Sequence, residues 1–143
     1  MGDTPWDVVY FEPFEPADSP IRFLDSCPMN VQAQMAAVLD AVAAAPPPQF
    51  SGGGHRGAMH REMTGFFEAR KQGPRREQFR LFCVLENPAT AEELERMGLS
   101  RPAIVVPTGM RKPWRTAFGE GEYEHVRELG ADYRSTFPRR IVI

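Results

Sequence analysis

The residues best suited to chemistry in this 143-residue chain are cations that flank a turn near its middle. Arginine is always protonated and can bind a phosphate through two parallel N–H donors. Preorganised cations also stabilise the negative charge that develops when a phosphodiester is attacked. Such residues predict a surface for a polyanion, against the simpler alternative of a solvated turn. The cations concerned are Arg61, Arg70, Lys71, Arg75, Arg76 and Arg80.

The charge of the chain is distributed unevenly along the sequence. The formal net charge is −2, which by itself predicts no nucleic-acid binding. Residues 1–25 hold six acids and one base, a balance of −5, whereas residues 55–80 hold seven bases and three acids, a balance of +4. Residues 101–115 add four bases and no acid. This asymmetry predicts a local basic patch and an acidic N-terminal arm over residues 1–18, which would shield that patch in cis.

Several functional classes are disfavoured by the sequence. Cys27 and Cys83 have no spacing typical of a zinc site or a disulfide framework, so we expect no metal and no cofactor. The N-terminus has neither the basic flank nor the apolar core of a signal peptide. The longest apolar stretch, Met35–Ala45, is short and is interrupted by Asp40, so no segment is expected to span a membrane. We therefore expect a cytoplasmic protein.

The elements that position the cations follow from apolar periodicity and from residues that start or stop helices. Residues 6–11 predict a first strand, and Ser19 before Pro20 predicts the start of a short helix. A second helix is expected from Pro28 to the proline run at 46–48. Together these two helices form an N-terminal helical hairpin.

The second half of the chain predicts mainly strands. A Gly-rich loop, 51–60, leads to residues 59–63, which could pair at a sheet edge, and then to strands over 65–71 and 78–86, joined by a turn containing Gly73-Pro74. An inserted segment, 87–101, predicts a helix capped by Thr90 and ended by Gly98. The remaining expected elements are a strand over 103–108, a loop over 109–122, a helix over 122–135 frayed near Gly130, and a basic-apolar tail over 136–143.

This order of elements predicts a single α+β domain over residues 1–143, with helices packed on a small, mainly antiparallel sheet. Alternation along the strands places Glu68 and Arg70 on one face, and it places Arg80 on one face of the neighbouring strand. The sheet can therefore present Arg70 and Arg80 together. The simpler alternative is a surface ion pair of these arginines with Glu68, Glu77 or Glu86.

The ordered series of motifs resembles the HigB branch of the RelE-type toxins of bacterial toxin–antitoxin systems, including phage-derived relatives. The resemblance covers residues 6 to 135 and implies a RelE-like fold. It rests on an aromatic first strand, a helical hairpin, a Gly-rich loop, two Arg-bearing strands and a loop with an apolar residue and a lysine after glycine. In this sequence the motifs read WDVVYF, FFEAR, FRLFCVLE and GMRKPWRT.

The resemblance implies a metal-independent endoribonuclease that cleaves mRNA on the ribosome and is neutralised by a cognate antitoxin protein. In that reaction a ribose 2′-hydroxyl attacks the neighbouring phosphodiester, and protein cations stabilise the transition state. By motif the catalytic cations map onto Arg70, Arg80 and Lys112. No motif places the general base, for which His60 is the candidate, with His125 and Tyr133 on the last helix as alternatives. Relatives often have two adjacent lysines, whereas here Pro113 follows Lys112, and the inserted segment 87–101 is longer than expected.

Further residues around the turn and the last loop are candidates for RNA contact. For the arginines the alternative is a solvated turn, and for Trp114 it is a packed loop anchor. The candidates are Lys71, Arg75, Arg76, Arg111, Trp114 and Arg115.

Two rival functions remain open at this point. One is a catalytically inactive RelE-fold binding module, such as a phage or prophage protein or an inhibitor of a host target like DNA gyrase. The other is an interaction protein whose basic hairpin docks an acidic partner. A His, Tyr or Glu within hydrogen-bond reach of Arg70, Arg80 and Lys112 favours catalysis, whereas cations scattered over opposite faces of the sheet favour the interaction protein.

Overall fold

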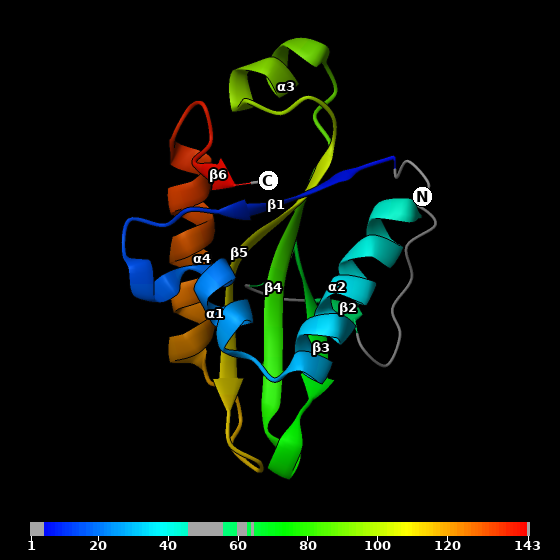
Figure 1. Cartoon of the computed structure of the whole chain (residues 1–143). Coiled ribbons are helices and arrows are strands. Elements are labelled where there is room, and N and C mark those ends of the chain that lie inside the picture. Colours follow the sequence, from blue (N-terminus) through cyan, green and yellow to red (C-terminus); the bar gives the residue numbers. More distant parts are fainter. Residues whose placement is uncertain (1–4, 46–55, 60–62, 64, 143) are drawn as a thin grey trace.

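The computed structural model of the protein describes residues 5–45, 56–59, 63 and 65–142. Its centre is one six-stranded sheet in the order β2-β3-β4-β5-β1-β6 (Figure 1). Among the described strands, β1 and β5 are parallel neighbours and all other neighbours are antiparallel, which confirms the predicted α+β class. The strands are β1 (Asp7–Phe11), β2 (Arg56–Ala58), β3 (Phe66–Gln72), β4 (Gln78–Glu86), β5 (Ala103–Lys112) and β6 (Ile141–Val142).

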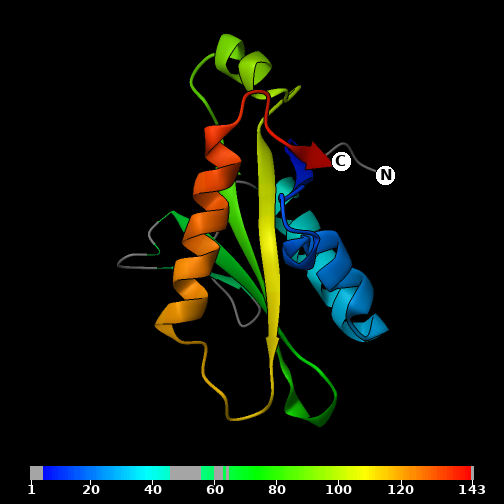
Figure 2. The ribbon, with the colours of Figure 1, turned by 90° about the vertical axis from the view of Figure 1, so that its left-hand side faces the viewer.

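Helices cover both faces of the sheet. The helical pair α1 (Pro20–Ser26) and α2 (Met29–Ala44) lies on one face, and α4 (Glu120–Ser135) lies on the other, as Figure 2 shows. The start predicted at Ser19 is confirmed, because the Ser19 hydroxyl accepts a hydrogen bond from the Arg22 amide at 3.3 Å. No described helix is long and apolar enough to cross a membrane.

Strand alternation divides the hydrophobic core between the two faces. Residues on the α2 side include Phe67, Phe79, Leu81 and Ile104, all buried with Val31, Met35 and Val42 of α2. Residues on the α4 side include Phe66, Phe82, Val84 and Val105, all buried with Val126, Leu129 and Tyr133 of α4.

The inserted segment forms α3 (Ala91–Met97), which stands at one end of the molecule (Figure 1). Its predicted caps are confirmed: the Thr90 hydroxyl accepts from the Glu93 amide at 3.2 Å, and Gly98 ends the helix with φ of 84°. The turn between β3 and β4 and the loop between β5 and α4 lie together at the opposite end (Figures 1 and 2).

Two predictions about element bounds were wrong, and another lies partly outside the described residues. Residues 59–63 were expected to pair at a sheet edge: the Met59 amide donates to the Phe66 carbonyl at 3.0 Å, whereas residues 60–62 lie outside the described residues. The strand β2 that pairs with β3 is Arg56–Ala58. The last predicted strand continues to Lys112, so residues 109–112 belong to β5 instead of a loop. Phe82 pairs with Thr108 but Val84 pairs with Val105, and this register shift accommodates Pro107, which has no N–H to donate.

The second wrong prediction concerns α4, which runs unbroken through Gly130. A side chain at this position would meet the ring of Phe66, because an added Cβ would lie 2.8 Å from its Cζ. The glycine therefore allows α4 to approach the sheet closely. The C-terminal tail adds the edge strand β6 beside β1.

Candidate anion-binding site

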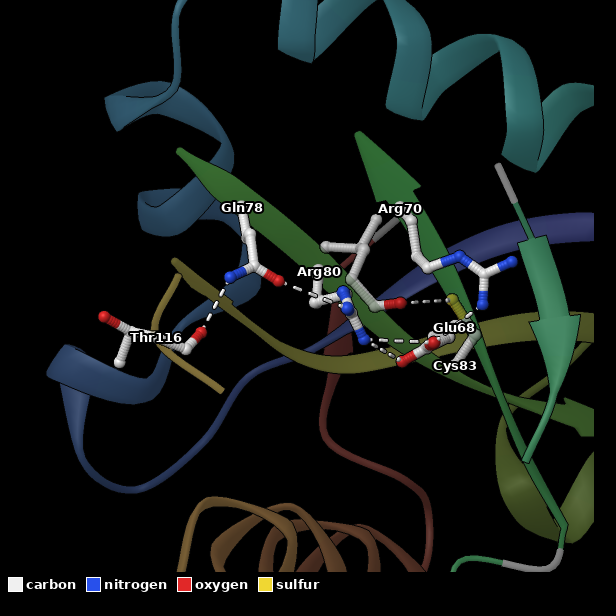
Figure 3. Close-up of polar contacts among 7 residues, drawn as sticks. Glu68, Arg70, Gln78, Arg80, Cys83 and Thr116 are labelled. Atoms are coloured by element: carbon white, nitrogen blue, oxygen red, sulfur yellow. Dashed lines mark hydrogen bonds and ion pairs between the residues drawn. The ribbon is translucent and has the colours of Figure 1, made fainter. Parts of the chain in front are cut away.

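The register of the sheet brings two arginines together around one carboxylate. Arg70 of β3 is the direct partner of Arg80 on β4. Glu68, one alternation earlier on β3, lies between them (Figure 3). Its carboxylate accepts from Arg70 Nη1 at 2.9 Å and from Arg80 Nη1 at 3.0 and 3.1 Å. The prediction that the sheet presents Arg70 and Arg80 on one face is confirmed, and so is the alternative that they pair with Glu68.

This Arg70–Glu68–Arg80 cluster is partly sheltered from solvent. The side chain of Glu68 is 9% exposed, whereas those of Arg80 and Arg70 are 20% and 36% exposed. Because the two arginine side chains are more accessible than that of Glu68, an incoming anion would meet the arginines before the Glu68 carboxylate. The carboxylate limits the rotamers of both arginines and so preorganises them.

The loop that precedes α4 folds over Arg80. The Arg80 guanidinium carbon lies 4.9 Å from the centre of the Phe118 ring, a cation–π arrangement. Gln78 connects the same arginine to the loop: its amide oxygen is 3.5 Å from Arg80 Nη2, and its amide nitrogen donates to the Thr116 carbonyl at 2.7 Å (Figure 3). Contacts from β4 and from the loop therefore fix the position of the Arg80 side chain.

Lys112 lies on the same face, at the end of β5. It is the register partner of Gln78, next to the pair formed by Arg80 and Met110. Its ammonium is 3.3 Å from a carboxylate oxygen of Glu122 in the first turn of α4. The Gly119 amide donates to that same oxygen, and this hydrogen bond, followed by that from Lys112, lowers the pKa of Glu122.

Charges on this face are largely compensated. Arg70, Arg80 and Lys112 supply three positive charges, and Glu68 and Glu122 supply two negative charges, which leaves +1. The face is thus an ordered set of ion pairs on regular strands, with limited net attraction for a polyanion.

Two candidate RNA-binding residues lie on the other face of the sheet. Lys71 and Arg111 both have Phe79 as register partner, and Phe79 belongs to the core under α2. Arg111 forms a two-point ion pair with Glu77 at 2.9 and 3.0 Å and stacks 4.8 Å from the Phe79 ring centre. The predicted cations are therefore spread over both faces, as expected for the interaction-protein alternative.

The other four candidates form a separate group at the end of the molecule, which we name the arginine–tryptophan tip. The guanidinium carbons of Arg76 and Arg115 lie 4.8 and 4.4 Å from the Trp114 ring centre. Trp114 is 45% exposed, so it is no buried loop anchor. The tip consists of Arg75 and Arg76 from the β3–β4 turn and Trp114 and Arg115 from the β5–α4 loop.

Candidate proton-transfer residues lie away from these cations or outside the described residues. His60, and Arg61 beside it, lie outside the described residues. His125 Nε2 is 2.7 Å from an Asp18 carboxylate oxygen, and this hydrogen bond raises the pKa of His125. The Tyr133 hydroxyl donates to Glu86 at 2.8 Å, and burial raises its pKa. Neither contact joins the Arg70–Glu68–Arg80 cluster.

The acidic N-terminal segment makes its described ion pairs elsewhere. Asp7 of β1 pairs with Arg101 at 2.7 Å, and Asp18 contacts His125. These carboxylates do not cover Arg70, Arg80 or the tip. Residues 1–4 of this segment lie outside the described residues.

Two partners in the site were not predicted from the sequence, namely Phe118 and Glu122. Glu68, in contrast, is expected from the sequence as an ion-pair partner of both arginines, because alternation places it beside Arg70. The contacts of Phe118 and Glu122 depend on how the β5–α4 loop folds, which no local pattern indicates. Within the described part of the chain, no group of three or more His, Cys, Asp or Glu side chains could hold a metal ion.

Comparison of the chain with protein-family models, with curated proteins and with solved structures found no match. The geometry of the chain itself is therefore the basis for assigning a function.

Proposed function

We propose that the protein is a toxin of the type II toxin–antitoxin class that cleaves ribosome-bound mRNA, with Arg70, Arg80 and Lys112 as the phosphate-binding cations. One observation supports this most: Arg70 and Arg80 are direct cross-strand partners, fixed by the buried Glu68 carboxylate and accessible to solvent. Lys112 at the end of β5 extends the same face.

The chemistry needs no metal. The ribose 2′-hydroxyl loses its proton to a base, its oxygen forms a bond to phosphorus, and the bond from phosphorus to the 5′-oxygen breaks as that oxygen gains a proton. The products are a 2′,3′-cyclic phosphate and a 5′-hydroxyl. Arg70 and Arg80 bind the non-bridging oxygens, where charge develops, and Glu68 is the positioning residue that orients them.

The test is induced expression in a bacterial host, with growth followed and mRNA ends mapped by primer extension. The variant is Glu68→Gln/Arg70→Gln/Arg80→Gln, which removes both cations without leaving the buried carboxylate unpaired. Asp7→Asn/Arg101→Gln is the matched control, because it removes an ion pair near the α3 end of the sheet.

The wild type and the control should arrest growth and produce cuts inside translated frames, and the triple variant should do neither while remaining folded. Loss of a single preorganised donor usually lowers the rate about 100-fold or more. Absence of cuts with a soluble, folded wild type would overturn the nuclease. A cognate antitoxin is expected to cover this face with acidic residues.

A second candidate function is a binding module of the same fold without catalysis, such as an inhibitor of a host target like DNA gyrase. The observation that favours it is charge compensation, since Glu68 and Glu122 already pair with the three cations. Growth arrest without mRNA cuts, together with loss of supercoiled plasmid, would support this alternative.

A further inference from the structure

Three arginines at the end of the molecule occupy a backbone conformation that disfavours them. Arg75, Arg76 and Arg115 have φ angles of 58°, 59° and 66°, in the left-handed region where glycine is usual. A residue with a Cβ costs on the order of 1 kcal/mol there. Left-handed positions in turns and loops are more often occupied by glycine or asparagine. The sequence instead places a cation at each of the three positions.

These arginines also differ from the other cations in their partners. None of the ion pairs found among the described residues involves Arg75, Arg76 or Arg115. The tip therefore carries three positive charges without a described carboxylate within ion-pair distance. An uncompensated cluster of this kind attracts polyanions by releasing their counterions.

Trp114 holds two of these three arginines in a defined arrangement. Two guanidiniums from different segments stack on one half-exposed indole ring, Arg76 from the turn and Arg115 from the loop. Flat guanidinium and indole groups are the platforms on which unpaired bases stack. The turn and the loop are held close to each other by the hydrogen bond from Gln78 to Thr116, so the platform is shared between two segments.

We propose that the arginine–tryptophan tip binds single-stranded nucleic acid, with bases stacked on the Trp114–arginine platform and phosphates bound by the guanidinium edges. The site is separate from the Arg70–Glu68–Arg80 cluster and does not depend on whether that cluster cleaves RNA. An acidic peptide would satisfy the charges but offers no planar bases, so the stacked geometry favours a nucleic-acid strand.

The first measurement is fluorescence anisotropy with a labelled oligouridine of about 12 nucleotides, within the usual footprint of such proteins. Arg76→Gly/Arg115→Gly removes both stacked cations and relieves the left-handed backbone, so this variant should fold at least as well as the wild type. Arg22→Gln/Arg134→Gln is the charge-matched control, because both arginines are exposed and belong to α1 and to the last turn of α4, instead of to the turn and the loop that form the tip.

The glycine variant should bind at least about 5-fold more weakly. The slope of log K against log salt concentration should also become shallower, by roughly 0.7 for each phosphate that the variant no longer binds. The control should bind like the wild type. Equal weakening in both variants would mean a nonspecific charge effect and would overturn the proposal.

A second pair of variants tests stacking rather than charge. Trp114→Ala should lose roughly 5-fold or more in affinity, whereas Trp114→Phe, which keeps an aromatic face, should retain most of it. Binding should also quench tryptophan fluorescence, because Trp114 is exposed and the other tryptophan, Trp6, is buried.

One competition assay and one vesicle-binding assay identify the class of partner. Polyglutamate that competes as well as oligouridine at equal charge would overturn the nucleic-acid assignment in favour of an acidic protein. Cosedimentation with anionic vesicles that is lost in the same variants, without oligouridine binding, would overturn it in favour of a membrane surface. Weak competition by polyglutamate, together with no vesicle binding, would support a nucleic-acid strand as the partner.

Discussion

The two cationic regions of this molecule lie near one end of the same sheet but are built differently. In the Arg70–Glu68–Arg80 cluster the arginines sit on regular strands and share a buried carboxylate. In the arginine–tryptophan tip they sit in a turn and a loop, in left-handed conformations, and two of them, Arg76 and Arg115, lie over an exposed ring. The first region is compensated and relaxed, whereas the second is uncompensated and strained.

This difference separates two ways of holding a cation. An internal carboxylate fixes a guanidinium precisely enough for chemistry but cancels much of its attraction for a distant anion. An aromatic ring fixes it more loosely and leaves its charge intact. In the two functions proposed above, the cluster acts on a phosphate that has already arrived, and the tip captures a strand from solution.

The largest expected effect on stability distinguishes the two regions. Arg80→Ala should lower the free energy of unfolding by about 2 kcal/mol, because the buried Glu68 carboxylate loses two of its hydrogen bonds. This loss of stability is smaller than that expected for a fully buried ion pair, since the Arg80 side chain is 20% exposed and Arg70 remains bound to Glu68. Urea unfolding followed by circular dichroism gives the measurement.

Arg76→Ala at the tip should change the same free energy by less than about 0.5 kcal/mol, because no described carboxylate depends on it. Adding Glu68→Gln to Arg80→Ala should restore at least half of the lost stability, since the uncompensated charge is then gone. An Arg80→Ala protein as stable as Arg76→Ala would show that the Glu68 carboxylate does not depend on Arg80. The two cationic regions would then not differ in their contribution to stability.

A smaller effect of opposite sign is expected in the turn. Arg75→Gly should raise the free energy of unfolding by about 0.5 kcal/mol, because glycine adopts φ of 58° without a steric penalty. Part of the gain is offset by the greater entropy of glycine in the unfolded chain. Thermal unfolding of the two proteins in parallel gives the comparison.

Arg75→Ala is the matched variant, because alanine removes the cation but keeps the Cβ that causes the strain. It should be no more stable than the wild type. If Arg75→Ala stabilised the protein as much as Arg75→Gly, the cause would be relief of charge repulsion among the arginines. Backbone strain at position 75 would then make no measurable contribution to the free energy of unfolding.

Much of the cluster could be predicted from the sequence, because it depends on a period of two. Once residues 65–71 and 78–86 are recognised as strands, alternation places Glu68 with Arg70 and separates Lys71 from both. The position of Arg111 on the other face of the sheet could not be predicted, because it requires β5 to continue past Pro107. That continuation depends on a register shift against β4, which is a tertiary feature.

The tip could be predicted only in composition. Its four residues are visible as a basic, aromatic group, but their contact requires the β3–β4 turn and the β5–α4 loop to meet. The left-handed conformations were not predictable either, because turn propensities favour glycine or asparagine there and arginine gives no such signal. The turn is closed by backbone hydrogen bonds, from the Gly73 amide to the Glu77 carbonyl and from the Glu77 amide to the Pro74 carbonyl, which residue types do not indicate.

The smallest expected effect concerns the ion pair of Lys112 with Glu122, at the edge of the face that carries Arg70 and Arg80. The lowered pKa of Glu122 means that its carboxylate contributes stability above its unfolded pKa, which is lost as pH falls through the folded value. Lys112→Gln should raise this pKa, but only partly, because the Gly119 amide is the larger cause and remains in place.

Carboxyl-carbon NMR titration of Glu122 measures this change, and Arg115→Gln is the control, since Arg115 contacts Trp114 instead of Glu122. A pKa that moves equally in both variants would mean that Glu122 senses the general positive field at this end of the molecule. A pKa that moves in Lys112→Gln alone would mean that compensation is pairwise, and that the charge of the tip stays separate from the ion pairs of the sheet.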